Sequence, residues 1–141
     1  MNYNVKGLND LSKQFHEFQI NAGFADSNIT QRLMLVHSEI SEAFEAYRKD
    51  KYARLTDFEA LVSKSRIIQK DPSYVGTISP EFAWKTKFES CIKDSFEDEL
   101  ADVIIRLLAL CAENNIDIER HIQLKMKYNE LRGFKYGGKK F

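Results

Sequence analysis

Cysteine is scarce in this chain of 141 residues, and so is any long run of apolar side chains. Two cysteines, Cys91 and Cys111, are too few for a disulfide framework, and we expect reduced thiols in a cytoplasmic protein. The longest uninterrupted apolar run, Leu107–Ala112, is far too short to cross a membrane. The first six residues lead into no apolar segment, so the sequence shows no signal peptide.

A net charge is also missing, because 21 Lys and Arg are matched by 21 Asp and Glu. No overall field therefore attracts nucleic acid or a membrane. The charges are nevertheless segregated: residues 120–141 hold seven basic side chains and one acid, and residues 89–102 hold six acids and one lysine. An acidic pocket beside a basic arm suits a metal-chelated polyanion, whereas two solvated surfaces of opposite sign are the simpler interpretation.

Strand patterns are absent too, and the apolar periodicity predicts an all-α fold in one domain over residues 1–141. Gly23 is expected to end a first helix, and a capping box from Thr56 to Glu59 is expected to begin a third. The remaining helices are expected to begin near Asn28, Ser79, Ser95 and Asp117.

Residues 96–112 show the periodicity of a helix that is apolar on nearly all sides. Its narrow polar strip consists of Ser95, Glu99, Asp102, Arg106 and Glu113. Such a helix belongs near the centre of a fold or in a subunit interface. Glu99 and Asp102, one turn apart on it, therefore need an explanation.

An earlier helical segment, residues 31–47, carries a second acid pair, Glu39 and Glu42, at the same i, i+3 spacing. We expect both acids to lie at the border of an apolar face made of Leu33, Val36, Ile40, Ala43, Phe44 and Tyr47. If the two helices meet there, four carboxylates come together. Each close pair would repel by roughly 3 kcal/mol at an effective dielectric of about 20, unless a cation lies between them.

Carboxylates without His or Cys are hard oxygen ligands, which suit Mg²⁺ or Mn²⁺ rather than Zn²⁺. The chain has no Glu-x-x-His motif, which a di-iron bundle would need. It also has no His-Asp pair, which an HD-type phosphohydrolase would need. The reaction class that these residues still allow is metal-assisted hydrolysis of a phosphate compound. The basic C-terminal segment could then hold phosphate through Lys125 or Lys127, with Asn129, Arg132 and Lys139.

Four segments together resemble the MazG-like, all-α nucleoside triphosphate pyrophosphohydrolases. They are Glu39-Ile40-Ser41-Glu42, Glu99-Leu100-Ala101-Asp102, Lys127-Tyr128-Asn129-Glu130-Leu131-Arg132 and Gly138-Lys139-Lys140-Phe141. The resemblance implies a helical bundle, a Mg²⁺-dependent cut between the α and β phosphates, and release of a nucleoside monophosphate and pyrophosphate. It implies that Glu39, Glu42, Glu99 and Asp102 bind the metal and carry catalysis. It also implies a homodimer or a dimer of dimers.

The chain departs from that family in one respect, because 56 residues, Ala43 to Asp98, separate its two acid pairs. Residues 51–93 are therefore interpreted as an insertion, and residues 134–141 as a flexible basic tail. Two other interpretations stay open. The chain could be a helical interaction module whose basic arm binds nucleic acid, or a purely structural bundle.

Overall fold

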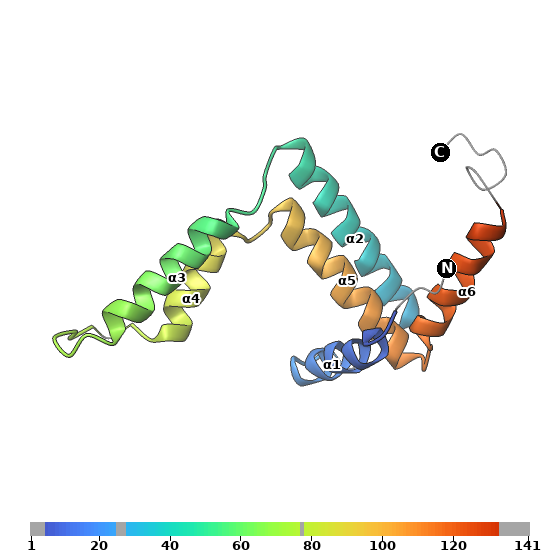
Figure 1. Cartoon of the computed structure of the whole chain (residues 1–141), viewed down its shortest axis with the longest axis horizontal. Helices are drawn as coiled ribbons and strands as arrows, with labels where there is room; N and C mark the ends of the chain where they lie inside the picture. The colour runs from blue at the N-terminus through green and yellow to red at the C-terminus, as the bar shows by residue number, and fades with distance from the viewer. Residues whose placement is uncertain (1–4, 25–27, 77, 133–141) are drawn as a thin grey trace. The chain divides into compact units, whose positions relative to one another are not determined.

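The computed structural model describes residues 5–24, 28–76 and 78–132. Over these residues the chain forms six α-helices and no strand, which confirms the all-α class. The helices, labelled in Figure 1, are α1 (Leu8–Asn21), α2 (Ile29–Arg48), α3 (Leu55–Gln69), α4 (Pro80–Cys91), α5 (Phe96–Glu113) and α6 (Ile118–Leu131). No helix among the described residues has the length and apolar character that crossing a membrane requires.

The described residues fall into two compact units, and the long helices α2 and α5 run through both. One unit comprises the chain up to Val36 and from Ile104 onward, so it holds α1, the start of α2, the end of α5, and α6. The other unit comprises His37–Val103 and holds α3, α4 and both acid-bearing stretches. The single domain expected over residues 1–141 stays a prediction.

Most helix starts follow the capping signals of the sequence. The Asn28 side chain accepts a hydrogen bond from the Gln31 N–H (2.9 Å), while the Gln31 side chain accepts one from the Asn28 N–H (3.2 Å). The side chains of Ser79 and Asp117 cap α4 and α6 by accepting hydrogen bonds from the N–H groups of Phe82 and Arg120. The capping box expected at Thr56 is wrong, because α3 begins one residue earlier and has no side-chain cap.

Residues in the left-handed region follow several helices, and those after α1 and α5 show how such an end is built. After α1, Gly23 has φ 91°, and the Phe24 N–H donates to the Gln19 carbonyl at 3.0 Å, which confirms the predicted end. After α5, Asn115 has φ 52° and the following Ile116 N–H donates to the Cys111 carbonyl at 2.9 Å. Both arrangements satisfy carbonyl groups that the end of a helix would leave without partners.

The buried face of α2 differs from the predicted one. Val36 and Ala43 are buried as expected, but the other members of the buried face are Arg32, Glu39 and Ala46. Four residues of the predicted buried face are each more than half exposed in the single chain, namely Leu33, Ile40, Phe44 and Tyr47. Small alanines allow a neighbouring helix to approach closely, and the polar residues on this face find partners inside the chain.

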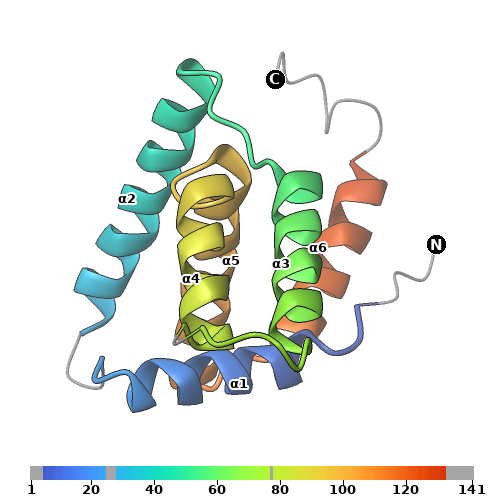
Figure 2. The ribbon, with the colours of Figure 1, turned by 90° about the vertical axis from the view of Figure 1, so that its left-hand side faces the viewer.

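The segment between the acid-bearing helices forms an antiparallel hairpin of α3 and α4, which lie side by side (Figure 2). The two ends of this segment are joined by hydrogen bonds: the Arg54 N–H donates to the Cys91 carbonyl at 2.9 Å, and the Phe96 N–H donates to the Lys51 carbonyl at 2.8 Å. The chain therefore leaves α2 and re-enters α5 at neighbouring positions. Neighbouring ends of this kind are what we expect of a segment inserted between α2 and α5.

In the other unit, Asn9 joins the starts of α1 and α6. Its side-chain amide donates to the Asp117 carboxylate at 2.8 Å, and its carbonyl oxygen accepts from the Ile118 N–H at 3.1 Å. The Asn9 side chain and the Arg120 N–H both donate to Asp117 and lower the pKa of that carboxyl group. These bonds fix the start of α6, the helix that carries the predicted phosphate-binding residues.

Candidate metal centre

Two carboxylates of the site come from α2. Glu39 lies on the buried face of that helix and is only 7% exposed, whereas Glu42, one turn later, is exposed. The Ser38 hydroxyl lies 3.2 Å from a Glu42 carboxylate oxygen and donates a hydrogen bond to it. This contact orients the one acid of the group that burial does not already fix.

The third carboxylate, Glu99, comes from α5 and is only 6% exposed. It lies close to the start of that helix, where the helix dipole favours negative charge. Glu39, Glu42 and Glu99 each place a carboxylate oxygen so that all three oxygens lie within 4.8 Å of one another. Three of the four predicted ligands are therefore brought together, from two helices far apart in sequence.

Aromatic packing and a hydrogen bond join the start of α5 to the end of α2 and to the linker that follows α2. The ring of Phe96 lies 5.8 Å from the ring of Tyr47 and 6.2 Å from that of Tyr52, between ring centroids. Glu97 accepts a hydrogen bond from the Ala53 N–H at 2.8 Å. The acid cluster is thus built on rigid helices and not on loops.

The surroundings of Glu99 make that carboxyl group harder to ionise. Burial, followed by repulsion from Glu42 and Glu39, raises the pKa of Glu99 from 4.5 to about 7. Asp98 and Asp102 add smaller repulsions in the same direction. Near neutral pH the metal-free Glu99 therefore loses its proton less readily than an exposed glutamate would.

These residues fit a hard divalent cation. The donor set consists of carboxylate oxygens alone, which suits Mg²⁺ or Mn²⁺ and not a metal that prefers sulfur or imidazole. Burying the ionised form of Glu99 is costly, and a cation among the three carboxylates would lower that cost. The structure supports a candidate metal site at Glu39, Glu42 and Glu99, whose metal is not identified.

Asp102, the fourth predicted ligand, lies outside this group of three. It is half-buried on α5, one turn beyond Glu99, and close enough to raise the pKa of Glu99. Its i, i+3 spacing places it on the same side of α5. The i, i+3 spacing places Glu39 beside Glu42, the fold brings Glu99 to them, and Asp102 is not part of the group whose oxygens lie within 4.8 Å of one another.

The predicted phosphate-binding residues of α6 lie in the other unit. Lys127 forms an ion pair with Glu130 at 3.6 Å. Lys125 and Arg132 instead both lie over the ring of Tyr128, at 5.2 and 5.6 Å from its centroid. At about 100° per residue, Lys125, Asn129 and Arg132 share one face of α6, whereas Lys127 lies nearly opposite Asn129. Lys139, the fourth predicted residue, lies outside the described residues.

Sequence reasoning missed one polar contact at the site and one buried residue in the other unit. Ser38 stands four residues before Glu42, a spacing that could have suggested the hydrogen bond they make. Buried Arg32 could not have been found this way, because its partners come from distant segments.

Comparisons of the chain with protein-family models, with curated proteins and with solved structures gave no match. The resemblance to MazG-like enzymes therefore rests on the motif residues themselves.

Proposed function

We propose that this chain is a Mg²⁺-dependent nucleoside triphosphate pyrophosphohydrolase of the MazG-like type. The observation that carries the proposal is the convergence of Glu39, Glu42 and Glu99, whose oxygens lie within 4.8 Å of one another although two of these side chains are buried. A solvated surface would not require buried acids at such short separations. The same three residues belong to the two acid motifs on which the family resemblance is based.

In this proposal Glu39, Glu42 and Glu99 hold the cation, and Asp102 completes the acid set of the motif. Bound Mg²⁺ would neutralise charge on the phosphate oxygens and favour the attack of water on the anhydride. The helices α2 and α5 fix the carboxylates in place before substrate arrives, and Ser38 restrains the exposed Glu42. Because these charges are already in position, little free energy is needed to rearrange them during the reaction.

The remaining phosphate charge is assigned to α6. Of the two lysines that the sequence left open, Lys125 fits the role better, because it shares a face with Asn129 and Arg132, while Lys127 pairs with Glu130. A guanidinium that binds two phosphate oxygens at once adds directional hydrogen bonds to the charge attraction. Lys139 in the basic tail is kept as a further phosphate ligand.

The product distinguishes this reaction from other phosphate hydrolyses. Incubation of the purified chain with a panel of nucleoside triphosphates and Mg²⁺ should release pyrophosphate and the monophosphate, and excess chelator should abolish turnover. Orthophosphate with a residual diphosphate would refute a cut between the α and β phosphates. Absence of turnover, together with salt-sensitive binding of nucleic acid, would favour the interaction module instead.

We also propose that the enzyme is a homodimer or a dimer of dimers. The apolar stripe of α2 supports this, since Leu33, Ile40, Phe44 and Tyr47 recur at helical spacing and are each more than half exposed. On α5, Leu100, Ile104 and Leu107 form a second exposed apolar row. Rows of exposed apolar side chains on a helix are typical of an interface between subunits.

A charge in the middle of the α2 stripe should break the oligomer. Phe44→Glu is expected to lower the mass in solution to that of one chain, 16.4 kDa, because an apolar interface does not tolerate an unpaired carboxylate. Lys49→Glu, at the end of the same helix and outside the stripe, should leave the mass unchanged. Light scattering coupled to gel filtration measures both. A parent chain that is already a monomer at micromolar concentration would contradict the proposal.

A further inference from the structure

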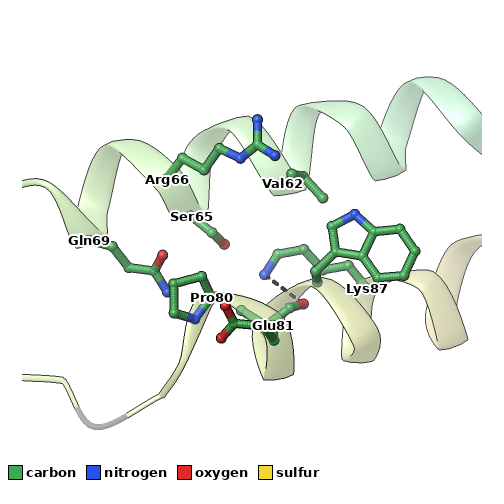
Figure 3. Close-up of a pocket in the computed structure, with 9 residues that line it drawn as sticks. Val62, Ser65, Arg66, Gln69, Pro80, Glu81 and Lys87 are labelled. Carbon is green, nitrogen blue, oxygen red and sulfur yellow. Dashed lines mark hydrogen bonds between the residues drawn. The ribbon is translucent and has the colours of Figure 1, made fainter.

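The hairpin of α3 and α4 is packed by aromatic rings at one end and is hollow toward the other. Trp84 stacks on Phe88 with ring centroids 5.2 Å apart and an angle of 13°, and Phe58 packs edge-on against Trp84 at 5.4 Å. Beside these rings lies a hollow of about 310 Å³ (Figure 3), whose lining includes Val62, Arg66, Pro80, Glu81, Trp84 and Lys87.

The hollow combines an anchored aromatic side chain with cationic groups. Trp84 is 45% exposed although two aromatic neighbours fix its orientation, so part of the indole stays accessible. Figure 3 shows the Lys87 side chain extending between the two helices, where its ammonium donates to the Ala83 carbonyl at 3.3 Å. Among the residues that the structure describes, Arg66 has no ion-pair partner. With Glu81 as the one acid of the lining, its formal charge is two cations minus one anion, or +1.

We infer that this hollow is a binding site for a small planar organic anion, an aromatic ring that bears a carboxylate or a phosphate. The ring would pack against the indole of Trp84 and the aliphatic parts of Val62 and Pro80. The anionic group would accept hydrogen bonds from Arg66, whose planar fork matches two oxygens at once, and from Lys87. The volume lies at the lower end of the range for small-molecule sites, which favours a ring system of modest size.

This site is distinct from the carboxylate cluster. None of its lining residues belongs to the acid motifs or to α6, and its charge is opposite to that of the cluster. The inference therefore does not depend on the proposed hydrolysis, and either can fail without the other. It also gives the inserted hairpin a role of its own.

Trp84 is the only tryptophan of the chain, so its indole N–H gives a single resonance that reports directly on the hollow. In a titration of the full-length chain with 2-naphthoate, followed by ¹H–¹⁵N correlation spectra, this resonance should shift and saturate. The neutral analogue 2-naphthamide should bind about tenfold more weakly, because it offers no anionic oxygen to Arg66 and Lys87.

Two variants and one control test the assigned cations. Arg66→Gln and Lys87→Gln should each weaken 2-naphthoate binding about tenfold. Lys85→Gln, which alters an exposed lysine of α4 outside the lining, should leave the affinity unchanged. The inference is overturned if the Trp84 resonance does not respond, if 2-naphthamide binds as tightly as 2-naphthoate, or if Arg66→Gln matches the parent. Because Arg66 is exposed and Lys87 lies at the surface of the hairpin, neither change should unfold the chain.

Discussion

The Glu99→Gln variant is expected to lose about a hundredfold or more in kcat on nucleoside triphosphates, because changes behind a metal's direct ligands already cost ten- to a hundredfold. Glutamine keeps the size of the side chain and removes the charge that would hold the cation. Steady-state pyrophosphate release at saturating Mg²⁺ measures the effect.

Glu45→Gln provides the matched control, since it makes the same chemical change on α2 at an exposed acid that pairs with Arg48 at 2.9 Å. That variant should keep kcat within about twofold, because Glu45 is not one of the three clustered carboxylates. Its fold should also be unaffected, since exposed ion pairs contribute little to stability. If Glu99→Gln and Glu45→Gln were equally active, the buried carboxylates would have no part in catalysis.

The second large effect is expected at Arg32, whose buried guanidinium joins three segments of one unit. Its Nε lies 2.7 Å from a carboxylate oxygen of Glu113, Nη1 donates to the Gln19 side chain at 2.6 Å, and Nη2 donates to the Phe24 carbonyl at 2.9 Å. Arg32→Leu should therefore lower the free energy of unfolding by about 3–5 kcal/mol, the usual cost of removing one partner of a buried ion pair.

Urea denaturation of the parent and of Arg32→Leu measures this loss. Arg48→Leu removes an exposed arginine of the same helix and should change stability by less than about 1 kcal/mol. The double variant Arg32→Leu with Glu113→Leu should recover part of the stability, because no buried charge is then left alone. Equal unfolding midpoints for Arg32→Leu and Arg48→Leu would show that the buried network does not stabilise the unit.

The order and type of the helices could be predicted from the sequence because local signals determine them. Ser79 and Asp117 form side-chain caps whose meaning depends only on neighbouring residues, and Gly23 ends α1 for the same reason. The capping box predicted at Thr56 was wrong, because the start of α3 coincides with a contact between residues far apart in sequence. The Arg54 N–H is bonded to the Cys91 carbonyl at 2.9 Å across the base of the hairpin, just where α3 begins.

Periodicity located the acid pairs but not the buried face of α2. Leu33, Ile40 and Phe44 form the most apolar side of this helix, yet the single chain buries the side that carries Arg32 and Glu39. A hydrophobic stripe has the same spacing whether it faces the chain's own core or another subunit. The sequence alone therefore could not separate the surface proposed to bind a second copy from the interior of one chain.

The ionisation of Glu99 gives the metal-free protein a defined dependence on pH. Its pKa is 4.5 in the absence of structure and about 7 in the fold, so the folded state holds this proton more tightly than the unfolded state. The stability that this proton contributes is present below about pH 4.5 and is lost as pH rises through 7. Above pH 7 the ionised cluster lowers the free energy of unfolding by up to about 3 kcal/mol, at about 1.4 kcal/mol per pKa unit.

Melting curves at pH 8, in chelator and in excess Mg²⁺, test the metal site most directly. The parent should melt at a higher temperature in Mg²⁺ than in chelator. The free energy of unfolding should rise by RT ln(1 + [L]/Kd), which is about 2.7 kcal/mol at a Mg²⁺ concentration of a hundred times Kd. In chelator, Glu99→Gln should melt above the parent, because it removes the buried charge, and it should gain little from Mg²⁺. A parent that melts at the same temperature in both buffers, with Glu99→Gln indistinguishable from it, would contradict a metal site at Glu39, Glu42 and Glu99.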